Sequence, residues 1–154
     1  MRPARLLSLM LLAVLACAGD SPTGPGPGSD PEVERFVSLV NAHRVEVGCP
    51  ALKWNGAVAG VAQAHSEDMV ARGFFAHTNP DGKSPFDRLS DAGVAYSSAA
   101  ENIAWGYPTA EAVLSGWLGS PGHKANIENC ALTEHGVGLR DTHWTHVFIR
   151  PPQS

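Results

Sequence analysis

The chain has 154 residues, which is enough for one domain with a single hydrophobic core. Its net charge is −4, and its 11 lysines and arginines form no run, so the composition argues against a nucleic-acid partner. A hydrophobic content of 44 % and four tryptophans exclude a chain that is disordered throughout.

The first 17 residues have the pattern of an export signal. Arg2 and Arg5 give a positive start, and an apolar stretch of about ten residues, 6–16, follows. This stretch is too short to span a bilayer comfortably. Its end, Val-Leu-Ala-Cys, resembles a bacterial lipoprotein cleavage box, so we expect lipid on Cys17. Ordinary signal cleavage near Ala18 is the alternative.

Residues 18–30 are dominated by Gly, Pro, Ser and Asp, a composition that predicts a semi-extended tether. The folded domain is then expected over residues 31–150. These features predict an exported protein that is anchored to a bacterial membrane only through lipid, or is otherwise secreted.

The chain contains three cysteines, an odd number for an exported protein. If Cys17 carries lipid, Cys49 and Cys130 remain to form a disulfide in an oxidising compartment. A bond that closes a loop of this length stabilises a fold by roughly 4 kcal/mol in the chain-entropy view. Two free thiols are the alternative.

A first helix is predicted after residue 30, with Ser29 or Asp30 as its cap and Pro31 in its first turn. Gly48 ends it. Apolar residues recur at helical spacing and predict one buried face. They are Val33, Phe36, Val37, Val40 and Val47.

A second helix is predicted from the cap Asn55 to about Arg72, with Gly73 as its stop. His65 falls on its apolar face. A single histidine in that position is most often a hydrogen-bonded core residue, and we expect this role for His65.

The rest of the chain predicts two more helices and a terminal hairpin. The helices cover residues 86–92 and 110–118, the second capped by Thr109, and residues 101–106 form a short strand or a loop. Residues 136–140 and 144–149 are predicted as strands joined by a tight turn. Alternation along the last strand places Trp144, His146 and Phe148 on one face and Thr145 and Val147 on the other. Helices followed by a hairpin favour an α+β sandwich over a parallel sheet.

Three segments carry the residues best suited to chemistry. His123 lies at the start of a short helical turn in residues 120–130, His77 follows a Gly-Phe-Phe-Ala sequence, and Glu101 begins Glu-Asn-Ile-Ala. Two neutral imidazoles and a carboxylate are ligands that suit zinc, with a position left open for water. The alternative is a hydrogen-bonded polar network that shapes the site without metal.

Eight segments of the chain, in this order, resemble bacterial members of the CAP superfamily, which includes cysteine-rich secretory proteins, venom allergens and plant pathogenesis-related proteins. They are residues 41–44, 52–55, 65–69, 74–77, 101–104, 117–126, 136–138 and 144–145. The resemblance implies an α-β-α sandwich with a central antiparallel sheet and a surface cleft.

The resemblance also assigns positions in that cleft. The family's two histidines correspond to His77 and His123, and its first glutamate to Glu101. Ser120 stands where many eukaryotic members have a second glutamate. His146 stands where similar bacterial chains often have glutamine, and it replaces the missing ligand if its strand face looks into the cleft.

Other site chemistries have less support. Ser120 precedes His123 by three residues, but no Gly-x-Ser-x-Gly sequence accompanies them, and no catalytic residue is assigned. The four tryptophans, Trp54, Trp105, Trp117 and Trp144, are expected mainly in the core, with a role in lining a binding groove as the alternative.

We therefore expect a non-enzymatic extracytoplasmic CAP domain that binds a ligand or partner. The resemblance implies lipids, including sterols and fatty acids, and cell-surface proteins as candidates. One alternative is a zinc-dependent hydrolase or protease with His77 and His123 as ligands and Glu101 as ligand or general base. Another is a structural envelope protein with a vestigial cleft.

Overall fold

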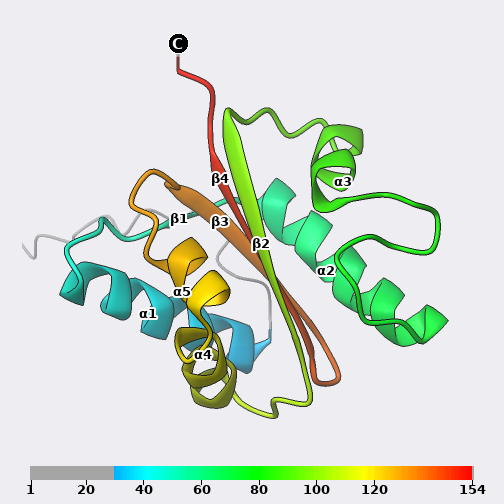
Figure 1. The fold of residues 1–154 in the computed structure, drawn as a ribbon, viewed down its shortest axis with the longest axis horizontal. Coiled ribbons are helices and arrows are strands. Elements are labelled where there is room, and N and C mark those ends of the chain that lie inside the picture. Colours follow the sequence, from blue (N-terminus) through cyan, green and yellow to red (C-terminus); the bar gives the residue numbers. More distant parts are fainter. Residues whose placement is uncertain (1–29, 154) are drawn as a thin grey trace, which may run out of the picture.

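The computed structural model describes residues 30–153, which form three layers (Figure 1). A four-stranded sheet separates two layers of helices. One layer contains α1 (Pro31–Glu46), α4 (Ala110–Leu118) and α5 (Pro121–Ile127), and the other contains α2 (Gly56–Arg72) and α3 (Pro85–Asp91). The predicted α+β sandwich is confirmed. The predicted signal, the lipidation site at Cys17 and the tether up to residue 29 lie outside the described residues.

The strands are β1 (Lys53–Trp54), β2 (Ser98–Trp105), β3 (Glu134–Arg140) and β4 (His143–Arg150), in the spatial order β1-β3-β4-β2. The predicted hairpin is β3–β4, and β2 pairs antiparallel with β4. The two-residue β1 pairs parallel with β3, so the sheet is mixed rather than wholly antiparallel. Such a short strand carries no alternating pattern that the sequence could reveal.

The N-terminal caps of α1, α2 and α4 and the end of α2 are the residues that the sequence indicated. The Asp30 side chain accepts a hydrogen bond from the Glu32 amide at 2.9 Å, and Asn55 and Thr109 cap α2 and α4 in the same way. Gly73 ends α2 with φ at 65°, a left-handed conformation that other residues rarely adopt.

The buried face of α1 differs from the prediction at its end. Val33, Phe36 and Val40 are buried, as expected, but Val47 is 46 % exposed. The prediction was wrong there because α1 ends at Glu46 and Val47 is its C-terminal cap. One turn beyond Val40, the buried position belongs to Arg44 instead.

The hydrophobic core lies on both faces of the sheet. Trp144 and Phe148 of β4 face α1 and α4, whereas Val147 packs with α2 residues and the Thr145 hydroxyl lies 2.8 Å from that of Ser66 on α2. The predicted alternation of faces along the last strand is therefore confirmed.

Cys49 and Cys130 form the expected disulfide, with their Cα atoms 5.0 Å apart. The bond connects the segment after α1 to the segment after α5 across 81 positions of sequence.

Helix α2 lies directly on β3 because two glycines remove the side chains between them. A Cβ atom added at Gly136 would lie 2.1 Å from the Ala59 nitrogen, and one at Gly138 would lie 2.4 Å from the backbone of Ala62 and Gln63. Both obstacles are backbone atoms, which cannot move aside as a flexible side chain can.

We predict that Gly138→Ala lowers the free energy of unfolding by about 3 kcal/mol, because the added methyl group forces α2 away from the sheet. Urea unfolding followed by circular dichroism measures this change. Gly60→Ala is the matched control, since its Cβ would meet nothing within 4 Å. That substitution should raise stability by roughly 0.5–1 kcal/mol. Equal effects of the two substitutions would contradict the packing argument.

Two histidines form a buried pair inside the core. His135 and His146 are each 0 % exposed, and His135 Nδ1 lies 3.0 Å from His146 Nε2. Burial, with the positive charge of Arg44, lowers the pKa of His135 to about 3. Burial, then the neighbouring His135 and Arg44, lowers the pKa of His146 well below its ordinary value.

The pair makes the fold sensitive to acid. Below pH ~6.5 the unfolded chain binds protons that the folded pair does not, so stability falls as pH falls and is unaffected by the pair at higher pH. We predict a loss of about 1.4 kcal/mol per pH unit for each histidine between pH ~6.5 and ~5. His146→Gln should reduce this slope by about half. An unchanged slope, measured by urea unfolding across this range, would contradict the assignment.

Candidate functional site

Glu101 of β2 is the centre of a buried ionic network. Its side chain is 2 % exposed, and its two carboxylate oxygens have different partners. Oε1 lies 2.8 Å from His77 Nδ1, and Oε2 accepts a hydrogen bond from Arg88 at 2.7 Å. Because both oxygens are engaged, Glu101 holds His77 and Arg88 in fixed positions.

The loop that carries His77 is fixed from two sides. The Arg88 guanidinium donates to the carbonyl oxygen of His77 at 2.7 Å and to that of Lys83 at 3.0 Å. His65 of α2 donates from Nε2 to the carbonyl oxygen of Ala76 at 2.9 Å. His65 is 1 % exposed, so the expected role as a hydrogen-bonded core residue is confirmed.

His123 lies on the opposite side of the same strand. Asn102, the next residue of β2, donates from its side chain to the His123 carbonyl oxygen at 3.1 Å and accepts from Asn126 at 2.8 Å. Burial, and secondly the charge of His77, lowers the pKa of His123. Since β2 is an edge strand, the site extends around the free edge of the sheet, with one histidine on each side.

The pairing with Glu101 determines which nitrogen of His77 is reactive. A carboxylate oxygen accepts hydrogen bonds, so Nδ1 carries the proton and the neutral ring presents its lone pair at Nε2. The His77 side chain is 51 % exposed. A histidine oriented in this way can accept a proton or bind a metal ion.

The donor set does not match a zinc site built from His77, His123 and Glu101 together. Both oxygens of Glu101 are already engaged, with His77 and Arg88, and its side chain is 2 % exposed, so the more accessible candidate ligands are the two imidazoles, where zinc usually has three or four protein ligands. Within residues 30–153, no three His, Cys, Asp or Glu side chains are arranged to hold a metal ion. Glu101 fits the role of a carboxylate that orients a histidine.

Two residues expected at the site lie elsewhere or take no part in the network. His146 is on the other face of the sheet from Glu101, because it pairs in register with Asn102 and points into the core beside His135. Its strand face therefore does not supply the missing ligand. Ser120 is the N-terminal cap residue of α5, and its hydroxyl makes no capping hydrogen bond.

The structure brings together two exposed aromatic residues: Trp105, one of the four tryptophans expected mainly in the core, and Phe75, to which no role was assigned from the sequence. Trp105, at the end of β2, is 61 % exposed, and Phe75, two residues before His77, is 46 % exposed. Their rings are 6.3 Å apart, and the ring of His143 stacks on Trp105 at 5.2 Å. Trp117 and Trp144 are in the core and Trp54 is half-buried, so Trp105 is the exception to the expected core role.

The family model for the cysteine-rich secretory protein family, CAP, matches residues 37–146. The chain belongs to this family. Two proteins of Bacillus subtilis, the uncharacterized protein YkwD and the uncharacterized membrane protein YlbC, are 38 % and 37 % identical to it over 118 and 117 residues. These matches cover 75 % and 76 % of this chain but only 46 % and 34 % of the relatives.

Solved structures of other bacterial proteins share the architecture. An extracellular protein with an SCP domain from Bacillus anthracis superposes with a TM-score of 0.75 at 37 % identity, covering 77 % of this chain and 40 % of that protein. An outer surface protein from Borrelia burgdorferi has a TM-score of 0.73 at 20 % identity, covering 79 % and 93 %, which shows the shared fold. In the described part of this CAP domain, no helix is long and apolar enough to cross a membrane.

We predict that Glu101→Gln lowers the free energy of unfolding by about 3 kcal/mol, because it leaves the charge of Arg88 buried without its partner. The Arg88 side chain is only 10 % exposed. His77→Ala removes the half-exposed partner and should cost less than about 1 kcal/mol. Thermal and urea unfolding of the two variants measure the difference. Equal losses would show that Glu101 does not anchor the network.

Proposed function

We propose that this chain is an exported, non-enzymatic CAP domain that binds a small amphipathic ligand, with a lipid as the leading candidate, at the outer edge of β2. The observation that carries the proposal is the exposed side chain of Trp105. It lies beside the ring of Phe75, and it follows Glu101 by four residues on β2. Large aromatic side chains exposed together are typical of ligand and partner surfaces.

The contacts around Trp105 support a binding role. Stacking by His143, with an interplanar angle of 18°, restricts the indole before any ligand arrives. A restricted side chain loses little conformational entropy on binding. His77, two residues after Phe75 in the sequence, presents a half-exposed imidazole. An apolar surface beside one polar group suits a ligand with an apolar body and a polar end.

The Glu101 network supports a non-enzymatic role. Its carboxylate is occupied by His77 and Arg88, so it is not free to act as a general base. The similarity to an extracellular protein and the predicted lipid on Cys17 favour a place outside the cytoplasm, at a membrane surface where lipids are available.

The test is a titration of the protein with oleate and with cholesterol, followed by tryptophan fluorescence. We predict that Trp105→Ala weakens binding at least tenfold and changes the free energy of unfolding by less than about 0.5 kcal/mol. Val45→Ala is the matched control, because Val45 is also 61 % exposed but lies on α1. Absence of binding to both probes, or equal affinity in the two variants, would reject the proposal.

A zinc-dependent hydrolase is the second candidate, favoured by the orientation that Glu101 gives to His77 Nε2. Calorimetric titration with zinc distinguishes it. Stoichiometric binding that is lost in the His77→Ala/His123→Ala double variant would support this candidate, and no binding by a folded protein would exclude it.

A further inference from the structure

The two ends of the Cys49–Cys130 disulfide differ in their access to solvent. Cys49 is 4 % exposed, whereas Cys130 is an exposed residue. Cys130 lies in a tight turn that is closed by a hydrogen bond from the Leu132 amide to the Asn129 carbonyl oxygen at 3.1 Å. Turns of this kind run over the surface of a fold. A molecule that approaches from solvent therefore meets Cys130 rather than Cys49.

The chain on both sides of the disulfide is anchored by contacts that do not need the bond. Arg44 donates to the carbonyl oxygens of Pro50 and Asn129, which are neighbours of the two cysteines, at 3.0 and 3.1 Å. Ile127 and Leu132, on the two sides of the turn, are 0 % and 1 % exposed and belong to the core. Cleavage of the S–S bond thus leaves both segments attached to the fold.

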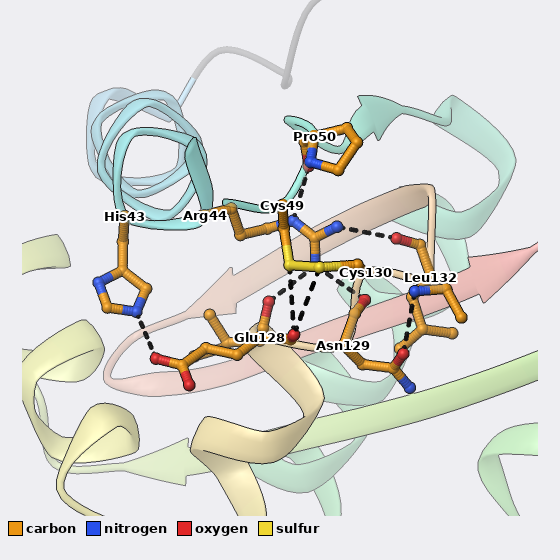
Figure 2. Close-up of a disulfide and its surroundings, with 10 residues drawn as sticks. His43, Arg44, Cys49, Pro50, Glu128, Asn129, Cys130 and Leu132 are labelled. Carbon is orange, nitrogen blue, oxygen red and sulfur yellow. Dashed lines mark hydrogen bonds and ion pairs between the residues drawn. A yellow bond between two sulfur atoms is a disulfide. The ribbon is translucent and has the colours of Figure 1, made fainter. Parts of the chain in front are cut away.

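The surroundings of Cys49 suit a sulfur atom that leaves as an anion. Arg44 is buried, and its hydrogen-bond partners in the described residues are backbone carbonyl oxygens rather than carboxylates, so no anion among them neutralises its charge. Figure 2 shows its guanidinium beside the disulfide. A nearby cation favours a thiolate over a thiol, and a more stable thiolate leaves faster. Once protonated, the Cys49 sulfur has an acceptor 3.3 Å away in the Glu128 carbonyl oxygen.

We propose that Cys130 is a modification site for low-molecular-weight thiols, which attack it by thiol–disulfide exchange with Cys49 as the leaving group. The thiolate of the small molecule forms a bond to Cys130 Sγ while the Cys49–Cys130 bond breaks. The electron pair of the broken bond goes to Cys49 Sγ, which then takes up a proton from water. The products are a mixed disulfide at Cys130 and a thiol at Cys49, so the reaction needs no further oxidant or reductant.

This modification acts on the attachment of α5, the helix that carries His123. The disulfide joins the segment after α1 to the segment after α5, and exchange removes this covalent link. The contacts of Arg44 and the buried side chains beside the turn remain. The modification site does not depend on the function proposed for the edge of β2.

The experiment uses the full chain with Cys17→Ser, so that a third thiol does not compete, and reduced glutathione as the probe. Samples are taken at increasing times and quenched with acid, and mass spectrometry of the peptides locates glutathione on singly modified chains. We predict at least tenfold more glutathione on Cys130 than on Cys49 in the folded chain. In urea, where both cysteines are accessible, the ratio should fall close to one. Circular dichroism should show that the modified chain stays folded.

Cys49→Ser and Cys130→Ser form a matched pair, because each leaves one thiol of the two. Glutathione disulfide should modify Cys130 in the first variant at least tenfold faster than Cys49 in the second, and unfolding in urea should remove the difference. The proposal is overturned by equal partition in the folded chain, by glutathione mainly on Cys49, by the absence of any modified chain, or by unfolding on modification.

Discussion

The fold depends on one buried cation, Arg44. Arg44 is 0 % exposed, and none of its hydrogen-bond partners in the described residues is a carboxylate. Its guanidinium instead donates, at 2.7 to 3.1 Å, to four backbone carbonyl oxygens, those of Pro50, Ile127, Asn129 and Leu132 (Figure 2). Ile127 is the last residue of α5, where the carbonyl groups of a helix end carry partial negative charge. Arg44 therefore joins α1, the segment after it, the end of α5 and the segment leading to β3. The Cys49–Cys130 disulfide lies beside it and fixes two of the same segments covalently.

This interaction has consequences at the site, because α5 carries His123. The end of α5 is held by Arg44, and its first turn is held by Asn102 of β2. The indole nitrogen of Trp117 donates to the Ile103 carbonyl oxygen at 3.2 Å, which fixes the same side of β2. The network of Glu101 and Arg88 fixes the other side. The edge strand is thus bound to helices through side chains on both faces, and this arrangement holds the two histidines in place around its edge.

Local signals made most of this fold predictable, and long-range contacts account for what the sequence did not reveal. The caps Asp30 and Asn55 and the stop Gly73 act within a few residues, so their positions alone predicted the helices. His77, Glu101 and His123 were singled out by residue type and assigned to one cleft by a resemblance, and the structure places them around one strand edge. Arg88 and Arg44 had no local signal, since their partners are mostly distant in sequence. His146 shows the same limit: the alternation predicted its strand face correctly, but not that this face is filled by His135 and aromatic rings.

The distribution of buried polar groups supports the proposed binding role. Arg44, Arg88, Glu101 and Asn102 are all buried or nearly so, and each uses its hydrogen-bonding atoms to hold backbone or another side chain. Such groups resist reorganisation, because any change of partner leaves a buried charge or amide unsatisfied. A reaction that required Glu101 to exchange a proton would have to separate it from Arg88. In the described part of the chain, the exposed ring of Trp105 and the Nε2 atom of His77 can meet another molecule without movement of the buried network.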